Sequence, residues 1–385
     1  MILSDQAIGV LGGGQLGTFL SIAAKQMGYR ITVWDPDPGA PAHAWADTRI
    51  ENAFDDAEAL FSFIHDNAVI TYEWENIPLD LVASIEKKRP VRPGSAILKQ
   101  LQNRIREKDF LSTQGFPVTP YLPVLDPTTL PAAAERLGFP LICKTATAGY
   151  DGIGQWRLTN AKAAAALRAK LKNRESGWIL EKVADFSKEL SVIVARNAAG
   201  AAVTYPVAEN THEDGILRLS QIPAKIPVVL SDRIASLGKK VITALEGTGL
   251  FCIEFFLLKD ETLLINEIAP RPHNSGHGTM EACDISQYAG QVRALCNLPL
   301  PPPHLLSPAM TINVLGDEIS VLRTEAALKK LLVIPGLHIY DYRKKEIKAR
   351  RKMGHITLTG PDSAALLARA RQVRDLLDDV SKNNS

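Results

Sequence analysis

The sequence predicts a chain of mixed α/β and α+β domains, because two folding patterns follow each other along it. Near the N-terminus, apolar strand-like segments alternate with helix-like ones, which predicts a parallel sheet covered by helices. In the middle of the chain, strand-like segments dominate, and several of them end in charged residues. With 385 residues, the chain exceeds the size at which a single core stops growing, so we expect two or three domains.

The first predicted domain, residues 1–96, is the parallel α/β unit. It begins with the strand-like "AIGV", a glycine-rich turn and the helix-like "TFLSIAAKQMG". The strand-like "RITVWD" and "NAVITYEWE" follow, and the turn-forming "PDPGAPA" lies between them. Pro90 and Pro93 then exclude a continuous helix, and we place the end of the domain there.

The second predicted domain, residues 97–298, begins with a helix and continues with the strand-like "PLICKTA", "GWILEKV", "KELSVIVARN", "FCIEFFLL" and "TLLINEI". The proline-rich "PLPPPHLLSP" predicts an extended connector to a third, small β-rich domain, residues 299–385. Strands are expected there in "AMTINVLG", "LHIYDY" and "HITLTG". A closing amphipathic helix should pack on the core through one apolar stripe, made of Leu366, Leu367, Ala370, Val373, Leu377 and Val380.

Composition and charge argue against several kinds of partner and location. The net charge of +2 is too small to indicate a nucleic-acid or membrane partner by itself. The four cysteines lack metal-type spacing, and Cys143 and Cys252 lie in apolar runs, which suits reduced thiols in the cytoplasm. The segment "MILSDQAIGV" lacks the basic region and long apolar core of a signal peptide, and no apolar run reaches membrane-spanning length.

The first motif is a glycine-rich turn between a strand and a helix. Gly12, Gly14 and Gly17 form G-x-G-x-x-G, and the acidic Asp35 follows about 20 residues later. Such a turn lets a phosphate reach backbone N–H groups at a helix N-terminus. By pattern alone this indicates a dinucleotide site, and hence an NAD-dependent oxidoreductase; the alternative is a turn that glycine allows for close strand–helix packing.

The second motif is a glycine loop that directly follows a lysine. Lys144 ends the strand-like "PLICK", and Gly149, Gly152 and Gly154 surround Asp151 in the loop after it. Lysine supplies a point charge and the loop supplies backbone donors, which together suit a polyphosphate. A plain hairpin turn would explain the glycines but leaves Lys144 without a role.

The third motif is a pair of carboxylates inside apolar strands. Glu254 lies in "FCIEFF" and Glu267 in "LLINEI". A buried carboxylate without a cation is unfavourable, so the pair predicts either Mg²⁺ ligands or two ion pairs with Lys or Arg. Behind Glu267 the exit loop "APRPHNSGH" gathers polar groups, which a proline-fixed polar turn would also explain.

Together these motifs resemble the ATP-grasp ligases, in which ATP lies between two α+β lobes and an N-terminal Rossmann-like (pre-ATP-grasp) domain serves the acceptor substrate. Six segments in the same order resemble the 5-(carboxyamino)imidazole ribonucleotide synthases of de novo purine synthesis: "GGGQLG", "DPDPGAPA", "AGYDGIGQW", "HEDGILR", "NEIAPRPHNSGH" and "RKMGH". The resemblance covers nearly the whole chain. It implies ATP and Mg²⁺ as cofactors, 5-aminoimidazole ribonucleotide and bicarbonate as substrates, a homodimer, and a glycine turn that no longer binds a dinucleotide.

On the nucleotide side, the resemblance implies an ATP site built from the glycine loop, the interlobe hinge and the strand ends: Arg104, Lys144, Gly149, Tyr150, Asp151, Gly152, Ile153, Gly154, Gln155, Glu181, Lys182, Val183, Ala184, Glu189, His212, Asn266 and Glu267. Glu189 is expected on the ribose hydroxyls, and Glu254 and Glu267 are expected to hold Mg²⁺.

On the acceptor side, it implies a second set that meets the ribonucleotide and bicarbonate: Gln15, Leu16, Glu73, Tyr150, Asp151, Arg271, His273, Asn274, Ser275, Lys345, Arg351 and Lys352. The last three are expected to clamp the 5′-phosphate. Arg271 is a catalytic candidate beside bicarbonate. Asp151 is the first candidate for orienting or deprotonating the acceptor amine, and His273 is the second.

The chain departs from the family pattern at two places. Relatives often carry Lys-x-Arg-x-Gly-Gly before Tyr-Asp-Gly, whereas "KTATAG" runs here from Lys144 to Gly149. Thr18 stands where Arg is common after the glycine turn. Other interpretations are an ATP-grasp ligase for another ribonucleotide, the oxidoreductase, and a nucleic-acid-binding protein that uses the basic run "RKKEIKARRK".

Overall fold

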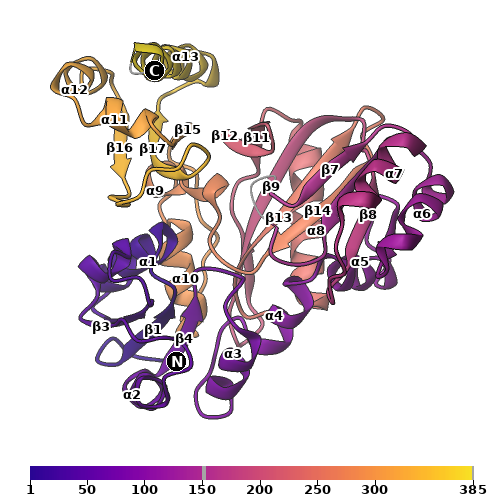
Figure 1. Ribbon diagram of the computed structural model, residues 1–385. Helices are drawn as coiled ribbons and strands as arrows, with labels where there is room; N and C mark the ends of the chain where they lie inside the picture. Colours follow the sequence, from indigo (N-terminus) through magenta and orange to yellow (C-terminus); the bar gives the residue numbers. More distant parts are fainter. Residues whose placement is uncertain (150–152, 384–385) are drawn as a thin grey trace.

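The computed structural model describes residues 1–149 and 153–383 and has the mixed α/β and α+β architecture that the sequence predicts. Figure 1 shows the N-terminal sheet and its helices at lower left, the C-terminal elements above them, and the middle of the chain at right. Three sheets organise the molecule, with four, nine and four strands among the described residues.

The N-terminal sheet is wholly parallel, as the alternation of strands and helices predicts. Its strand order is β3-β2-β1-β4. The strands are β1 (Ala7–Leu11), β2 (Arg30–Trp34), β3 (Thr48–Ile50) and β4 (Val69–Tyr72), and the helices are α1 (Gln15–Gln26), α2 (Ala57–Asp66) and α3 (Leu79–Glu86). β1 is buried along its whole length because α1 and α2 belong to the cores on its two faces. The glycine turn follows the carboxyl end of β1 and precedes α1, so it lies at the edge of the sheet where the parallel strands end.

A small antiparallel sheet of order β5-β8-β6-β7 forms one lobe of the middle region. It consists of β5 (Tyr121–Val124), β6 (Leu141–Thr145), β7 (Gln155–Leu158) and β8 (Trp178–Lys182), with α6 (Leu130–Leu137) and α7 (Ala161–Lys170) in its core. The lobe contains the predicted glycine loop, between β6 and β7, and the predicted hinge, at the end of β8.

The largest sheet has nine strands and joins the middle region to the C-terminal region. Its order is β14-β13-β9-β11-β12-β15-β17-β16, and β10 pairs with β9. The strands are β9 (Phe186–Arg196), β10 (Ala202–Thr204), β11 (Ala208–Glu213), β12 (Ile216–Ile222), β13 (Gly249–Leu258), β14 (Leu263–Ala269), β15 (Ala309–Leu315), β16 (Leu337–Asp341) and β17 (Lys352–Thr359). β12 pairs antiparallel with β15, so the sheet continues across residue 299.

The remaining helices cover or connect these sheets. They are α4 (Ser95–Leu101), α5 (Arg104–Thr113), α8 (Val228–Ala244), α9 (Thr279–Ala282), α10 (Gln287–Leu295), α11 (Glu318–Leu322), α12 (Glu325–Leu331) and α13 (Ser363–Asn383). Across residues 1–149 and 153–383, no helix combines the length and the apolar content needed to cross a bilayer.

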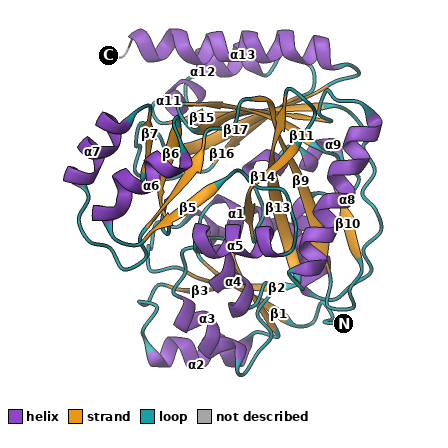
Figure 2. Ribbon diagram, turned by 90° about the vertical axis from the view of Figure 1, so that its right-hand side faces the viewer, coloured by secondary structure: helices purple, strands orange, loops and turns teal. Residues whose placement is uncertain are grey.

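The closing helix α13 runs over β15–β17 (Figure 2). Four residues of its predicted stripe belong to the core: Leu366, Ala370, Val373 and Leu377. The prediction was wrong for Leu367, which is 37% exposed because it lies one position around the helix from Leu366. Val380 lies outside the side chains that the structure describes.

An aromatic and histidine cluster joins the three parts of the chain. Phe19 of α1 packs edge-on against His277 and His355, whose rings stack with centroids 4.3 Å apart. The Tyr342 hydroxyl lies 3.1 Å from His277 Nε2 and 2.8 Å from His355 Nδ1. Burial lowers the pKa of both histidines, to about 3 for His355, so the two stacked rings are neutral. The cluster fixes the acceptor-side elements relative to one another.

Candidate active site

The glycine loop closes a hairpin between β6 and β7, with Lys144 opposite Gln155. Arg104, the first residue of α5, donates from its guanidinium to the carbonyl oxygens of Thr145 (3.3 Å) and Gly149 (2.9 Å). Arg104 thus holds the loop whose amides are predicted to meet phosphate. Asn103 starts α5 by accepting from two amides of the first turn, which fixes the position of Arg104.

Part of this loop lies within the described residues. Gly154 has a φ of 76°, and a Cβ there would come within 2.8 Å of Thr145 Oγ1, so glycine is required. The side chains of Ile153 and Gln155 are exposed. Three predicted residues, Tyr150, Asp151 and Gly152, lie outside the residues that the structure describes.

Glu181 on β8 forms ion pairs with two lysines next to the loop. The Lys144 ammonium lies 3.0 Å from Glu181 Oε2, and that of Lys108 lies 4.0 Å from the same oxygen. Burial alone would raise the pKa of Glu181, but Lys144, Lys108 and Arg104 lower it to about 2. The carboxylate is therefore ionised, and its Oε1 is buried without a hydrogen-bond partner.

The rest of the predicted hinge follows β8. Lys182 donates to the carbonyl oxygens of Gly138 (2.7 Å) and Phe139 (3.2 Å), and the Val183 amide bonds to Pro140 O (3.2 Å). These bonds fix the chain as it passes through Ala184 into the large sheet. On that sheet, Glu189 pairs with His212 across β9 and β11.

The surroundings of His212 favour its protonated form more than water does. Burial opposes the charge, but the hydrogen bond to Glu189 and the nearby Glu254 raise the pKa of His212 above its ordinary value. A cationic imidazole at this place would attract a phosphate or carboxylate.

The two predicted metal carboxylates stand opposite each other in the register of neighbouring strands. Glu254 on β13 is the register partner of Glu267 on the antiparallel β14. Asn266 donates from Nδ2 to Glu254 Oε2 (3.3 Å), and its own Oδ1 is buried without a partner. Two carboxylates and one amide oxygen suit Mg²⁺, which fills its remaining positions with water and phosphate oxygens. Among the described residues, no group of three or more His, Cys, Asp or Glu side chains forms a fuller metal site.

The exit loop behind β14 carries a second charged cluster. Arg271 makes a two-point contact with the Glu75 carboxylate, in which Nη2 donates to Oε1 at 2.9 Å. Burial would raise the pKa of Glu75, but Arg271 lowers it to about 2, so this pair is ionised. Arg271 therefore connects the exit loop to the N-terminal region. Sequence analysis missed Glu75, which stands two residues after the predicted Glu73 in a strand-exit segment.

His273 lies between the exit loop and the metal carboxylates. Its Nε2 is 3.2 Å from Glu254 Oε1, and its Nδ1 is 2.9 Å from Ser275 Oγ. Burial disfavours the charged ring, but Cys252 and Glu254 raise the pKa of His273 to about 10. Ser275 also contacts Ser191 Oγ at 2.8 Å, which fixes the loop on β9.

The acceptor-side residues of the N-terminal region lie at the glycine turn. Gln15 donates to Asn274 Oδ1 at 3.5 Å, which brings the turn and the exit loop together. Glu73 accepts hydrogen bonds from the amides of Gly14 (2.9 Å) and Gly17 (3.0 Å). The side chain of Leu16 is buried in the core, so only its backbone could meet a ligand.

The same turn explains the weakness of a dinucleotide interpretation. Besides the two bonds to Glu73, the Gly13 amide donates to Asp35 Oδ2 at 2.7 Å. A Cβ on Gly14 would come within 2.6 Å of Glu73 Oε1. The protein's own carboxylates therefore occupy the amides that a pyrophosphate would need.

Lys345 and Arg351 of the predicted phosphate clamp lie in the loop between β16 and β17, and Lys352 is the first residue of β17. Lys345 is exposed and lies against the turn at Gly39, whereas Arg351 is half-buried and donates to Glu346 O (3.1 Å). Lys352 is buried, as is Lys344, which donates to Lys352 O (2.9 Å). Because two of its lysines are buried, the basic run is not a uniform solvated face.

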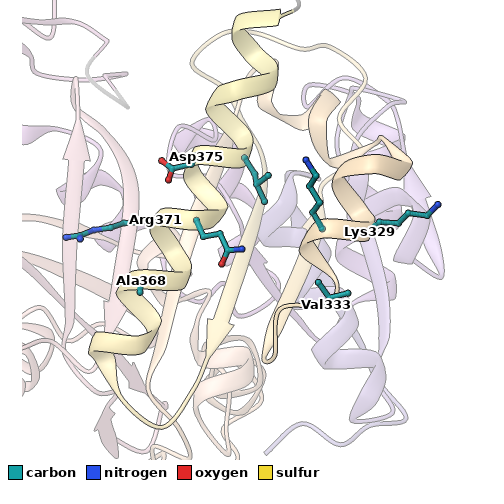
Figure 3. A pocket seen from close by; sticks show the side chains of 8 residues that line it. Lys329, Val333, Ala368, Arg371 and Asp375 are labelled. Atoms are coloured by element: carbon teal, nitrogen blue, oxygen red, sulfur yellow. The ribbon is translucent and has the colours of Figure 1, made fainter.

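A cavity of 860 Å³ opens between α1, the Pro38–Trp45 segment, α10 and β16, and both Gln15 and Lys345 line it. A second hollow, of 640 Å³, lies between α12 and α13 (Figure 3). It is lined by Lys329, Lys330, Val333, Ala368, Arg371, Gln372, Asp375 and Leu376. No predicted site residue lies in the second hollow, so it has no part in the candidate site.

Three family models match successive parts of the chain. The ribonucleotide synthetase preATP-grasp domain matches residues 6–102, the ATP-grasp domain matches residues 109–288, and the phosphoribosylaminoimidazole carboxylase C-terminal domain matches residues 309–369.

Relatives match over nearly the whole length. The N5-carboxyaminoimidazole ribonucleotide synthase of Bacillus subtilis is 39% identical over 93% of this chain and 92% of its own, and that of Brucella melitensis is 40% identical over 92% and 96%. Among solved structures, an ADP complex of such a synthetase superposes with a TM-score of 0.91 at 38% identity, covering 98% of both chains. The Aspergillus clavatus enzyme in complex with ADP and 5-aminoimidazole ribonucleotide gives 0.89 at 30% identity, covering 97% of this chain and 99% of its own.

Proposed function

Because this chain belongs to the N5-carboxyaminoimidazole ribonucleotide synthases, a family of ATP-grasp ligases, we propose that it carboxylates 5-aminoimidazole ribonucleotide with bicarbonate. The reaction consumes ATP and yields N5-carboxyaminoimidazole ribonucleotide, ADP and phosphate, in purine synthesis. The register pairing of Glu254 with Glu267 on two neighbouring strands is the observation of this structure that supports the proposal most directly.

The chemistry begins with a poor electrophile. Bicarbonate must lose hydroxide to react, so we propose that its oxygen first attacks the γ-phosphorus of ATP, giving carboxyphosphate and ADP. Catalysis of such a transfer is mostly positioning and charge neutralisation. Lys144 and Arg104 would hold phosphate oxygens under the loop, and His212 would add a third positive charge. Mg²⁺ held by Glu254 and Glu267, with Asn266 beside it, would neutralise charge on the β- and γ-phosphates.

The second step transfers the carboxyl group of carboxyphosphate, directly or as CO₂ released from it in place, to the exocyclic amine. The C–O bond to phosphate breaks and phosphate leaves, a C–N bond forms, and the amine nitrogen gives up a proton. Gln15, Glu73 and the exit loop would hold the ribonucleotide, and Lys345, Arg351 and Lys352 would bind its 5′-phosphate. The exit loop begins directly after a metal carboxylate, so the activated carbon and the amine would meet at one place, which can supply much of a bimolecular barrier. The intermediate hydrolyses in water, so the glycine loop should close before it forms.

His273 is better suited to donate than to accept a proton. Cys252 and Glu254 raise its pKa to about 10, against the effect of burial, and its Nε2 lies 3.2 Å from Glu254 Oε1, where it can donate an N–H to that carboxylate. We therefore propose that His273 contributes positive charge and a hydrogen bond, and that Asp151 receives or orients the amine proton. Arg271 would act beside bicarbonate while it remains paired with Glu75.

The proposal also covers the organisation of the protein. We propose domains at residues 1–96, 97–298 and 299–385, with the third completing the acceptor site. We propose a homodimer that works in the cytoplasm on small molecules, without nucleic acid or membrane. The four cysteines are all buried and free, which is compatible with a reducing compartment.

The test is ADP release with ATP, Mg²⁺, 5-aminoimidazole ribonucleotide and radiolabelled bicarbonate, each omitted in turn. Full turnover should need all four, and label should enter the ribonucleotide. Release that needs a different ribonucleotide would instead support the interpretation as another ATP-grasp ligase. Release that ignores bicarbonate would overturn the proposal.

A further inference from the structure

The strand that carries the metal residues has an irregular register. On β14, Glu267 pairs with Glu254 and Ile265 pairs with Phe255, so Asn266 is an extra residue between two paired ones. This is a β-bulge, in which two residues of one strand oppose one residue of its neighbour.

The bulge changes which face the side chains point to. Leu263 and Ile265 lie in the core two positions apart, but the next core residue is Ile268, three positions on. In a regular strand, neighbouring side chains point to opposite faces. Because the alternation shifts here, Asn266 and Glu267 both leave the core face, and both are less buried than the isoleucines on either side. Two consecutive polar side chains can therefore reach one ligand.

A bulge at a sheet edge needs partners for its free backbone groups, and β14 is the edge strand of the nine-stranded sheet. Two consecutive residues of α5 supply them. Lys108, only 1% exposed, donates to the carbonyl oxygens of Ile265 (3.1 Å) and Asn266 (2.8 Å). Glu107, 3% exposed, accepts from the Ile268 amide.

We propose that Glu107 and Lys108 are positioning residues, which hold the β14 bulge so that Asn266 and Glu267 face the same Mg²⁺–nucleotide. Neither touches substrate, and both act through the backbone of residues 265–268. The inference rests on the proposed function, because it takes Glu254 and Glu267 as the metal carboxylates.

A general role in stability does not explain the choice of residues. An apolar helix face would cover a sheet edge without burying two ionisable side chains. Lys108 also lies 4.0 Å from Glu181, on the predicted hinge of the other lobe. Together with Arg104, which holds the glycine loop, these residues make α5 the common support of the loop, the hinge and the metal strand.

The experiment compares variants that keep or lose the bonds. Glu107→Gln retains an oxygen that can accept from Ile268, whereas Glu107→Met has similar length and no acceptor. Lys108→Met removes both donations. Mn²⁺, which shares the oxygen chemistry of Mg²⁺, is titrated by electron paramagnetic resonance with ADP present, and ADP binding is measured separately in EDTA.

We expect Mn²⁺ affinity about 10- to 100-fold weaker in Glu107→Met and Lys108→Met, the usual effect of losing an outer partner of a metal ligand. Glu107→Gln should bind Mn²⁺ like the wild type, and ADP affinity in EDTA should stay nearly unchanged in both Glu107 variants. Lys108→Met also loses its contact with Glu181 on the hinge, so its ADP affinity is not used as a control. Arg196→Met is the matched control, since Arg196 donates to the backbone oxygen of Gly247 (3.0 Å) at the other end of the same sheet. Wild-type Mn²⁺ affinity in both methionine variants would overturn the proposal.

Two further measurements separate the possible failures. If Glu267→Gln binds Mn²⁺ like the wild type, the metal assignment of the proposed function fails; if it loses Mn²⁺ while the methionine variants do not, only the role of α5 fails. If those variants do not fold, hydrogen exchange in the wild type decides. The Ile268 amide should be among the slowest of β14, and fast exchange there would overturn the inference.

Discussion

Ala148 adopts a φ of 60° in the loop that follows Lys144. This left-handed conformation is unfavourable for any residue with a Cβ, by roughly 1–2 kcal/mol. The family pattern has glycine at this position, and it has arginine where Ala146 is fully buried here. These two differences have different consequences: alanine at position 148 adds backbone strain, and alanine at position 146 removes a positive charge.

Ala148→Gly should therefore leave the melting temperature unchanged or raise it. Relief of the left-handed strain is opposed by roughly 0.4–1 kcal/mol from the greater freedom of glycine in the unfolded chain. The matched control is Ala165→Gly on the exposed face of α7, which should lower stability by about 1 kcal/mol. An equal loss of stability in the two variants, measured by thermal unfolding, would contradict the left-handed backbone conformation of Ala148.

Glu267→Gln should abolish turnover in a protein that still folds. The substitution removes a proposed Mg²⁺ ligand but leaves no buried charge without a partner, because the charge itself disappears. We expect the turnover rate at saturating Mg²⁺ to fall by at least about 10- to 100-fold, which is the usual effect of substituting a residue that only supports a metal ligand. The check is steady-state ADP release beside a melting curve, and near-normal rates would end the metal assignment.

Sequence reasoning found residues whose chemistry is visible in the chain, but it missed their supports. A carboxylate in an apolar strand is conspicuous, so Glu254 and Glu267 were predicted, and the structure pairs them in register on neighbouring strands. Glu75, Glu107 and Lys108 stand in polar or charged segments, where such residues are usually exposed. Their burial depends on contacts 157 to 196 residues away, which no local pattern reports.

At the scale of the elements, the glycine turn before α1 shows that a dinucleotide-type sequence pattern can bind the protein's own carboxylates in place of a phosphate. Its pattern matches the dinucleotide fingerprint, yet the carboxylates of Glu73 and Asp35 accept from three of its amides. The strand–turn–helix geometry was predictable from the glycines. The identity of the anion was not, because Glu73 arrives from β4.

This difference predicts the response to nucleotides. ATP with Mg²⁺ should raise the melting temperature, by the equivalent of about 2.7 kcal/mol at 100 times the dissociation constant. NADH at the same concentration should not, since a phosphate would have to displace the carboxylates of Glu73 and Asp35 from the amides of the turn. A reproducible shift with NADH and none with ATP would restore the oxidoreductase interpretation.

The strands themselves were largely predictable, but the bulge in β14 was not recognised from its sequence. "LLINEI" contains the signal, because Ile265 and Ile268 are separated by three positions rather than two. An apolar spacing of three inside a strand indicates a shift in the alternation of faces. The resemblance named Asn266 and Glu267 as site residues without this detail, but it did not explain how two consecutive residues of a strand could both leave the core face.

At the scale of the whole molecule, the nine-stranded sheet passes from the middle region into the C-terminal region through the β12–β15 pair. Sequence reasoning predicted short strands beyond residue 299 but not their pairing, because β12 and β15 are far apart in the chain and any strand edge satisfies the same backbone bonds. Cross-contacts such as Glu281 on α9 with Tyr340 on β16 complete the junction.

Glu281 should make the stability of this junction depend on pH. Burial raises the pKa of Glu281 to about 7, against an ordinary value of 4.5, although the Tyr340 hydroxyl donates to it. Between these two values the folded protein holds a proton that the unfolded chain has released. Stability therefore falls as pH rises from 4.5 through 7, by at most about 3 kcal/mol, and is level above that range.

Glu281→Gln imitates the protonated carboxyl at every pH, so it should raise the melting temperature at pH 8 and change it little at pH 5. Glu325→Gln, on the exposed face of α12, is the control and should give the same small difference at both pH values. Thermal unfolding of the three proteins between pH 5 and 8.5 provides the measurement. A lower melting temperature for Glu281→Gln than for the wild type at pH 8 would contradict this prediction. It would mean that Tyr340 and the surrounding groups satisfy the ionised Glu281 carboxylate, so that the carboxylate stabilises the junction.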